Sequence, residues 1–209
     1  MPEKMHFEIL TKEQVELLKL IEKFNADYYL VGGTAIAYYL GHRESIDFDL
    51  FTNSKINDKS IYSKIRKSGI QKFDKLYEAF DQIHLKINKV KVTFFEFPFR
   101  IPSRRKFNGV ITIPSLLDLT AMKAFAFGGR GKWKDYVDMY FLLKERFTLE
   151  EIILRAEKLF NGEFNGKLFC MQLGYFDDIN FDEKVVFRRD FPDDAEIKEF
   201  LISKAVKAI

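Results

Sequence analysis

Residues 29–51 read YLVGGTAIAYYLGHRESIDFDLF, and this stretch decides the fold. Asp27–Val31 is aromatic and apolar enough to predict a buried strand. A Gly-Gly-Thr turn follows, after which Thr34–Leu40 predicts a short helix that ends at Gly41. Ile46–Phe51 predicts a second strand. A strand, a glycine turn, a helix and a strand are therefore expected in immediate succession.

The second of these strands carries two acids, Asp47 and Asp49, at positions i and i+2. Side chains alternate along a strand, so both carboxylates are expected on one face, with Ile46, Phe48 and Leu50 directed into the core. Two adjacent like charges are unfavourable unless a cation lies between them. Mg²⁺ prefers carboxylate oxygens together with phosphate oxygens of a substrate. The pair therefore predicts a metal site.

The glycine turn supplies the groups that a phosphate needs. Backbone N–H groups of Gly32 and Gly33, with the Thr34 hydroxyl, are expected to hold a β- or γ-phosphate at the helix N-terminus. Carboxylates on the adjacent strand would complete the arrangement typical of two-metal displacement at phosphorus. Taken singly, the turn can be an ordinary turn and the acids a surface pair. Their spacing favours a metal-and-nucleotide site.

The composition sets broad limits on the class of protein. The 209 residues are 47% apolar and 31% charged, which is typical of a globular protein. A formal charge of +3 is too small to indicate nucleic-acid binding by itself. Cys170 is the single cysteine, which excludes an internal disulfide framework. With no signal peptide and no membrane-length apolar run in the sequence, we expect a cytoplasmic protein with no membrane partner.

The remaining elements fall into two blocks, with strands mainly before Ser115 and helices after it. The first block predicts helices at 11–23, with Thr11 as N-cap and Gln14 at the capping-box position, and at 59–67. It predicts strands at 73–80, 82–87, 91–97 and 110–113, with a tight Asn88-Lys89 turn that joins 82–87 to 91–97 as a hairpin, and a loop at 98–108. The second predicts helices near 115–127, 134–146, 149–160, 166–173 and 195–207. We therefore expect an α+β fold. Its parts would be a core at 1–113 around a small mixed sheet and a helical part at 114–209, packed on the core and unable to fold alone.

The motifs GGTA (32–35) and GHRESIDFDLF (41–51) resemble those of the nucleotidyltransferase AbiEii/AbiGii toxin family, within the DNA polymerase β-like superfamily. The resemblance continues through Val90–Pro98, Met122–Leu143 and Tyr175–Asp178. It implies a minimal nucleotidyltransferase core that moves a nucleoside monophosphate from an NTP to an acceptor hydroxyl, with Mg²⁺ or Mn²⁺. Some relatives are toxins of toxin–antitoxin or phage-exclusion systems, and some modify tRNA ends. A tRNA acceptor and a cognate antitoxin are thus the implied partners.

Carried over by position, the resemblance implies that Asp47 and Asp49 are the metal ligands and act in catalysis. Arg43 and Ser45, in the preceding loop, would add contacts to a phosphate or the acceptor; a structural role in the loop is about equally compatible with the sequence. The resemblance also implies that the nucleotide triphosphate is held by Gly32, Gly33 and Thr34.

The resemblance implies two further catalytic residues in the helical part, Lys123 and Asp135, and one further nucleotide-binding residue, Arg130. Lys123 matches the family's helix lysine, which would neutralise triphosphate charge, although a surface lysine is the alternative. Asp135 matches an acid of the family's Lys-Asp-x-x-Asp segment and shares a helix face with Asp138. A carboxylate favoured by the helix dipole is the alternative for Asp135. Arg130 would pair with a phosphate or with these acids.

One position departs from the pattern of the superfamily, which places a third carboxylate on a later strand. The register of KVTFFEF (91–97) puts Thr93 there, and Glu96 would face the other side unless a bulge reverses the alternation. A hydroxyl is a poor general base, so deprotonation of the acceptor would be weakened. Among the histidines, His42 is closest to the site in sequence and is a candidate base, although a structural role in the loop is favoured for it.

Two other functional classes are compatible with these residues. A catalytically weak nucleotide- or RNA-binding module that acts through a partner would account for Thr93 and the small number of acids. A purely structural protein would leave the paired aspartates unexplained. We therefore favour a Mg²⁺-dependent nucleotidyltransferase.

Overall fold

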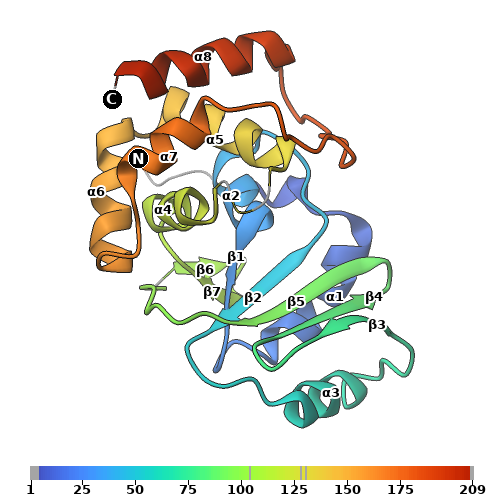
Figure 1. Ribbon diagram of the computed structural model, residues 1–209. Helices are drawn as coiled ribbons and strands as arrows, with labels where there is room; N and C mark the ends of the chain where they lie inside the picture. The colour runs from blue at the N-terminus through green and yellow to red at the C-terminus, as the bar shows by residue number, and fades with distance from the viewer. Residues whose placement is uncertain (1–4, 104, 128, 130, 208–209) are drawn as a thin grey trace. The chain divides into compact units, whose positions relative to one another are not determined.

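A computed structural model describes residues 5–103, 105–127, 129 and 131–207 of the chain (Figure 1). The chain divides into two compact units, Met1–Ser115 and Leu116–Ile209, called here the core unit and the helical unit. The core unit contains a sheet with helices, and the described part of the helical unit contains helices and irregular segments. The fold is therefore α+β, as predicted.

The core unit is built on one seven-stranded mixed sheet with the order β3-β4-β5-β2-β1-β7-β6 (Figure 1). β2 lies between β1, which is antiparallel to it, and β5, which is parallel to it. The strands are β1 (Tyr29–Val31), β2 (Phe48–Thr52), β3 (Asp74–Glu78), β4 (Gln82–Ile87), β5 (Val90–Glu96), β6 (Arg105–Phe107) and β7 (Ile111–Ile113). The acidic strand thus runs through the middle of the sheet.

One face of this sheet forms the aromatic core of the unit. Phe48 and Leu50 of β2 are fully buried, as predicted. Phe94 of β5 lies edge-on against Phe24, with ring centroids 4.8 Å apart. Ile46, by contrast, is 55% exposed, so the prediction for this residue was wrong. β2 begins only at Phe48, and strand alternation does not reach back to Ile46.

The helices of the core unit are η1 (Phe7–Ile9), α1 (Lys12–Glu22), α2 (Gly32–Leu40) and α3 (Asp58–Arg66). The predicted capping box of α1 is present: Gln14 N–H donates to the Thr11 hydroxyl, and Thr11 N–H donates to the Gln14 side chain. α2 begins at Gly32, two residues before the predicted start, and ends at Gly41 in the left-handed region.

Two antiparallel strand pairs of the sheet are joined by tight two-residue turns. Asn88 and Lys89 both have positive φ, at 47° and 68°, and close the predicted hairpin between β4 and β5. A second hairpin joins β6 and β7 through Asn108 and Gly109, with φ of 46° and 75°. The predicted loop at 98–108 was wrong in its last residues, because this Asn-Gly turn allows Arg105–Phe107 to pair as a strand.

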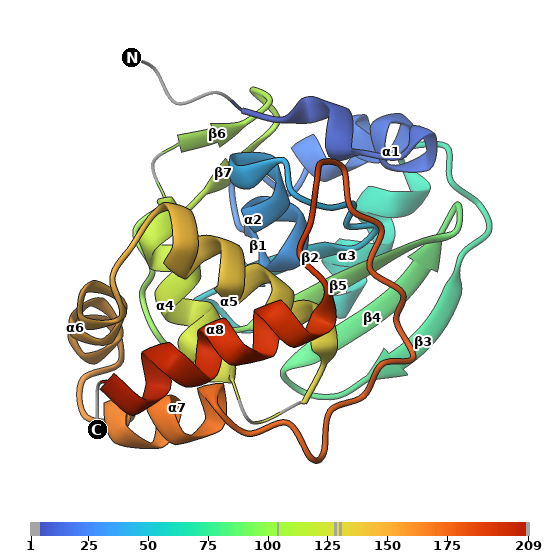
Figure 2. The same cartoon turned by 90° about the horizontal axis from the view of Figure 1, so that it is seen from above.

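The helical unit contains α4 (Leu116–Ala126), α5 (Trp133–Glu145), α6 (Leu149–Phe160), α7 (Gly166–Leu173) and α8 (Asp194–Lys207). α4 packs against α5 and α6, while α8 packs against α5 and α7 (Figure 2). Asp118 of α4 is buried and accepts hydrogen bonds from Arg155 of α6 at 2.5 Å. Within the described residues, no helix has both the length and the apolarity needed to cross a membrane.

Candidate active site

The start of α2 brings a glycine against the second acid. Gly32 has φ +73°, and a Cβ atom there would lie 2.2 Å from Asp49 Oδ2 and 3.0 Å from its Cγ. The pairing of Val31 with Asp49 between β1 and β2 produces this approach. Only glycine combines the left-handed backbone with the space that the carboxylate occupies. The glycine turn and the acidic strand therefore form one site.

The next glycine brings a cation and a hydroxyl to the same turn. A Cβ atom at Gly33 would lie 2.7 Å from Nη2 of Arg43 and 3.0 Å from Oγ of Ser45. Arg43 is 3% exposed, and its guanidinium also donates to the backbone carbonyl of Glu44 at 2.8 Å. Arg43 and Ser45 thus lie over the first turn of α2.

Thr34 links this turn to the approach of β2. Its side chain is 1% exposed, and its hydroxyl donates to the backbone carbonyl of Asp47 and contacts the Ser45 hydroxyl at 3.0 Å. We expected this hydroxyl to hold a phosphate, but it is engaged with the chain itself. A contact between Thr34 and a phosphate would therefore come from its backbone N–H.

Replacing Thr34 with valine, which has nearly the same shape, should lower the free energy of unfolding by about 1–3 kcal/mol, because it removes the buried hydroxyl that donates to the Asp47 carbonyl. Thr34→Ser keeps the hydroxyl and is the matched control. Urea denaturation of the two variants measures the difference. Equal stability of the two variants would contradict the positioning role of the hydroxyl.

The N-terminus of α2 is suited to an anion. Val31 is its N-cap and makes no side-chain capping bond, and its first turn contains no acidic residue. The first N–H groups of a helix have no intrahelical acceptors, and the helix dipole favours negative charge there. Gly33 and Thr34 supply N–H groups at this end, which is the arrangement that binds phosphates in many proteins.

The two aspartates fit a divalent metal that is shared with a substrate. Asp47 lies just before β2 and Asp49 within it, and both are partly exposed. Over the described residues, no group of three or more His, Cys, Asp or Glu side chains is placed to hold a metal ion. Mg²⁺ is commonly bound by one or two carboxylates plus phosphate oxygens and water, without a closed protein cage. The donor set therefore suits Mg²⁺ or Mn²⁺ together with a nucleotide.

Thr93 occupies the third position, as its register predicted. Parallel pairing of β2 with β5 sets Asp49 beside Thr93 and Thr52 beside Glu96. The β2–β5 and β4–β5 ladders are regular, so Glu96 faces the opposite side of the sheet from Asp49. The bulge that would have turned Glu96 toward the acids is not present in β5.

Sequence reasoning missed His84, which lies on the Asp49 face of the sheet. β4 sets His84 beside Thr93, and β3 sets Tyr77 beside His84. Burial lowers the pKa of His84, and Lys91 lowers it further, while Asp49 acts in the opposite direction. The signal was available in the sequence: counting back from the Asn88-Lys89 turn pairs residue 84 with residue 93.

The helical unit holds the remaining predicted residues in a buried ion cluster. Nζ of Lys123 lies 2.6 Å from Asp135 Oδ1 and 2.9 Å from Asp138 Oδ2. Lys123 is 8% exposed and Asp138 is fully buried. The surface alternative for Lys123 was therefore wrong. Arg130, the predicted partner of a phosphate or these acids, lies outside the described residues.

Replacing Lys123 with methionine should lower the free energy of unfolding by about 3–5 kcal/mol, since it removes the buried positive charge that pairs with two buried carboxylates. Lys158→Met on α6 removes an exposed lysine and is expected to change stability little. Chemical denaturation distinguishes the two variants. Similar stabilities would show that the ion cluster contributes little to the fold.

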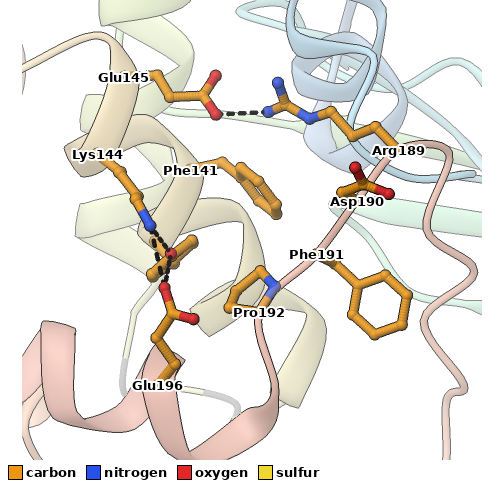
Figure 3. A pocket seen from close by; sticks show the side chains of 9 residues that line it. Phe141, Lys144, Glu145, Arg189, Asp190, Phe191, Pro192 and Glu196 are labelled. Atoms are coloured by element: carbon orange, nitrogen blue, oxygen red, sulfur yellow. Dashed lines mark hydrogen bonds and ion pairs between the residues drawn. The ribbon is translucent and has the colours of Figure 1, made fainter.

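A hollow of about 320 Å³ in the helical unit is lined by charged side chains that form ion pairs with one another (Figure 3). Lys144 pairs with Glu196 at 3.0 Å, and Arg189 pairs with Glu145 at 2.8 Å. The Tyr140 hydroxyl donates to Glu196 at 2.8 Å. These contacts join α5 to α8 and to the segment before it. We assign the hollow a structural role.

Comparison with known proteins identifies the family of this chain. The sequence model of the nucleotidyl transferase AbiEii toxin, described as a type IV toxin–antitoxin system, matches residues 17–203. The chain belongs to the AbiEii nucleotidyltransferase toxin family. It is accordingly a nucleotidyltransferase, as its motifs predicted.

Relatives of this AbiEii chain cover most of its length. An uncharacterized protein of Aquifex aeolicus, aq_aa25, is 31% identical over 204 residues, which are 93% of this chain and 95% of that protein. The crystal structure of JHP933 from Helicobacter pylori is similar with a TM-score of 0.55 and 16% identity, covering 95% of this chain and 92% of that one. MenT4, a nucleotidyltransferase toxin of Mycobacterium tuberculosis, is similar with a TM-score of 0.61 and 13% identity, covering 92% and 81%. At these identities the two structures support the fold alone.

Proposed function

We propose that this chain transfers a nucleoside monophosphate from an NTP to an acceptor hydroxyl, with Mg²⁺ or Mn²⁺ held by Asp47 and Asp49. The observation that supports this most strongly is the contact between the start of α2 and the acidic strand. The Asp49 carboxylate occupies the space that a side chain at Gly32 would need. A helix terminus suited to an anion and a carboxylate suited to a metal therefore lie side by side.

Each residue of the core-unit site has a distinct part in this proposal. N–H groups of Gly33 and Thr34 would hold the terminal phosphates of the NTP. Arg43 would add positive charge to the same phosphates, since its guanidinium lies against Gly33. Thr34 and Ser45 would fix the chain that leads to Asp47 through the hydroxyl contacts of Thr34.

Asp47 and Asp49 would bind the metal and orient the reacting phosphate. Bound Mg²⁺ would offset the negative charge of the triphosphate during the reaction. The acceptor oxygen forms a bond to the α-phosphorus while the bond from that phosphorus to the β-phosphate oxygen breaks. Pyrophosphate then leaves with the electron pair of the broken bond. Most of the rate enhancement would come from positioning and charge stabilisation.

For the helical unit, we propose on the basis of the family motif that Lys123 neutralises triphosphate charge and that Asp135 holds this lysine. The 2.6 Å contact between Nζ of Lys123 and Asp135 supports the second part. The same motif includes Arg130 as a further nucleotide-binding residue. An Asp135→Asn variant should therefore transfer nucleotide more slowly than the wild type. Chemical denaturation of the same variant measures its effect on stability separately.

The biological role we propose is that of a toxin with a tRNA acceptor and a cognate antitoxin. Membership of the AbiEii toxin family supports the toxin role. The description of MenT4 as a nucleotidyltransferase toxin is consistent with it. The tRNA acceptor rests on family resemblance, and the assay below tests it directly.

A transfer assay tests the proposed activity. Purified chain, Mg²⁺, each labelled NTP and total tRNA are incubated, and label on the RNA or on protein is measured. We expect label on tRNA that requires both the metal and the chain. The alternative is a catalytically weak nucleotide-binding module, which Thr93 in place of a third carboxylate would explain. Calorimetry with NTP and Mg²⁺ tests it, since tight binding without transfer to any acceptor would favour this alternative.

A further inference from the structure

A line of three side chains crosses the middle of the sheet on the face of the acids. Asp49 of β2 pairs with Thr93 of β5, and Thr93 pairs with His84 of β4. Directly paired residues on adjacent strands point to the same face. With strands about 4.8 Å apart, Asp49 and His84 are about 10 Å apart at their Cα atoms, with Thr93 between them.

The hydroxyl at the centre of this line is buried and unsatisfied. Thr93 is 7% exposed, and among the described residues no group forms a hydrogen bond with its Oγ1. A buried hydroxyl without a partner is unfavourable and requires an explanation, because the great majority of such groups are bonded. A substrate hydroxyl beside Asp49 could donate to this oxygen, and an imidazole nitrogen that carries a lone pair could accept from it.

One ring nitrogen of His84 is held by a hydrogen bond on its own strand. Its Nε2 lies 2.9 Å from Gln82 Oε1, and this contact favours the tautomer in which Nε2 carries the proton and donates to the carbonyl oxygen. Nδ1 then carries the lone pair. Its ring also lies 5.4 Å from that of Tyr77 on β3, which limits its rotation.

The groups around His84 favour a neutral ring at neutral pH. Lys91 of β5 faces it and lowers its pKa together with burial, which is the larger effect, while Asp49 opposes both. Tyr77 is the facing group on β3, and Lys86 lies two residues further along β4 on the same side. A neutral imidazole is the form that can accept a proton.

We propose that, once an acceptor hydroxyl lies beside Asp49, the Thr93 hydroxyl turns to bridge it to Nδ1 of His84, and that His84 takes up the acceptor's proton through this bridge. This inference rests on the proposed function and adds the group that stands in for the missing third carboxylate. The acceptor hydroxyl gives its proton to Thr93 Oγ1 while Thr93 gives its own to Nδ1 of His84. The acceptor oxygen bonds to the α-phosphorus, pyrophosphate leaves, and the imidazolium later releases the proton to solvent.

Kinetics of His84→Gln test the proposal, with Lys86→Gln on the same face of β4 as the matched control. We expect His84→Gln to lower kcat about 10²–10³-fold with little change in KM for the NTP, as for loss of a general base. The wild-type rate should fall as the pH drops through a pKa below 6.5, since protonation removes the accepting lone pair. His84→Gln should lack this acidic limb, and Lys86→Gln should retain it.

Two further variants distinguish a proton path from a structural effect. Thr93→Val removes the connecting hydroxyl and should lower kcat as His84→Gln does. Thr93→Asp restores a carboxylate beside Asp49, so the double variant with His84→Gln should regain activity. An NMR titration of the His84 ring protons, assigned from their absence in His84→Gln, should give a pKa below 6.5 without any turnover.

The outcomes separate this inference from the proposed function. A His84→Gln enzyme with wild-type kcat and acidic limb would overturn the role of His84 alone. Loss of activity that Thr93→Asp does not restore, in a folded protein, would overturn it as well. A wild-type chain that transfers no nucleotide to any acceptor would overturn both proposals.

Discussion

The double substitution Asp47→Asn and Asp49→Asn should reduce nucleotide transfer at least about 10³-fold, since the stabilisation provided by a bound metal corresponds to several kcal/mol. Asparagine keeps the size of each side chain and removes the charge that holds the metal. The transfer assay with labelled NTP measures the loss. Isothermal titration with Mn²⁺ should show the loss of metal binding in parallel.

The fold should survive this substitution. Both side chains are partly exposed, and removal of two adjacent negative charges relieves their repulsion. We therefore expect unfolding by urea at an equal or slightly higher concentration than for the wild type. Asp74→Asn on the exposed edge strand β3 is the matched control and should leave transfer unchanged. Transfer that persists in the double variant would contradict the assignment of both acids.

Replacing Gly32 with alanine should lower transfer about 10²-fold, the effect of displacing a catalytic group by about 1 Å. The new Cβ would lie 2.2 Å from Asp49 Oδ2 and 3.0 Å from its Cγ, so the Asp49 carboxylate must rotate away. Rotation of a side chain is tolerable for the fold but moves the carboxylate from its place at the start of α2. The assay at saturating Mg²⁺ measures the loss in kcat.

Gly69→Ala separates this effect from backbone strain. Gly69 has φ +85°, and a Cβ atom there has no neighbour within 4 Å. Both substitutions should cost about 1–2 kcal/mol of unfolding free energy, because alanine is strained in the left-handed region. Only Gly32→Ala should lose activity. Equal activity of the two variants would show that the contact with Asp49 has no functional part.

Local patterns in the sequence were sufficient to predict most of the secondary structure. The capping box at Thr11, the glycine end of α2 and the Asn88-Lys89 hairpin depend on a few neighbouring residues, and all three are confirmed. Ile46 was misjudged because burial depends on where β2 starts, which is determined by its partner strands. β6 was missed because the Asn-Gly turn at Asn108 was not used as a hairpin signal.

The arrangement of the site depended on contacts that are distant in sequence. The spacing of the glycine turn and the acids suggested that they meet, but the closeness of Asp49 to Gly32 requires the antiparallel pairing of β1 and β2. The burial of Lys123 could not be predicted because its partners, Asp135 and Asp138, lie on the next helix. The spacing of residues within one helix does not show which side chains of another helix it meets. His84 required the combined registers of three strands.

The central claim is that the start of α2 and the two aspartates bind one metal–nucleotide complex. A crystal structure with Mn²⁺ and an NTP analogue that resists cleavage between the α- and β-phosphates tests it most directly, because the anomalous signal of manganese locates the metal. We predict manganese on the carboxylates of Asp47 and Asp49 and phosphate oxygens at the N–H groups of Gly33 and Thr34. A nucleotide bound elsewhere, or bound here with manganese on neither carboxylate, would contradict the account.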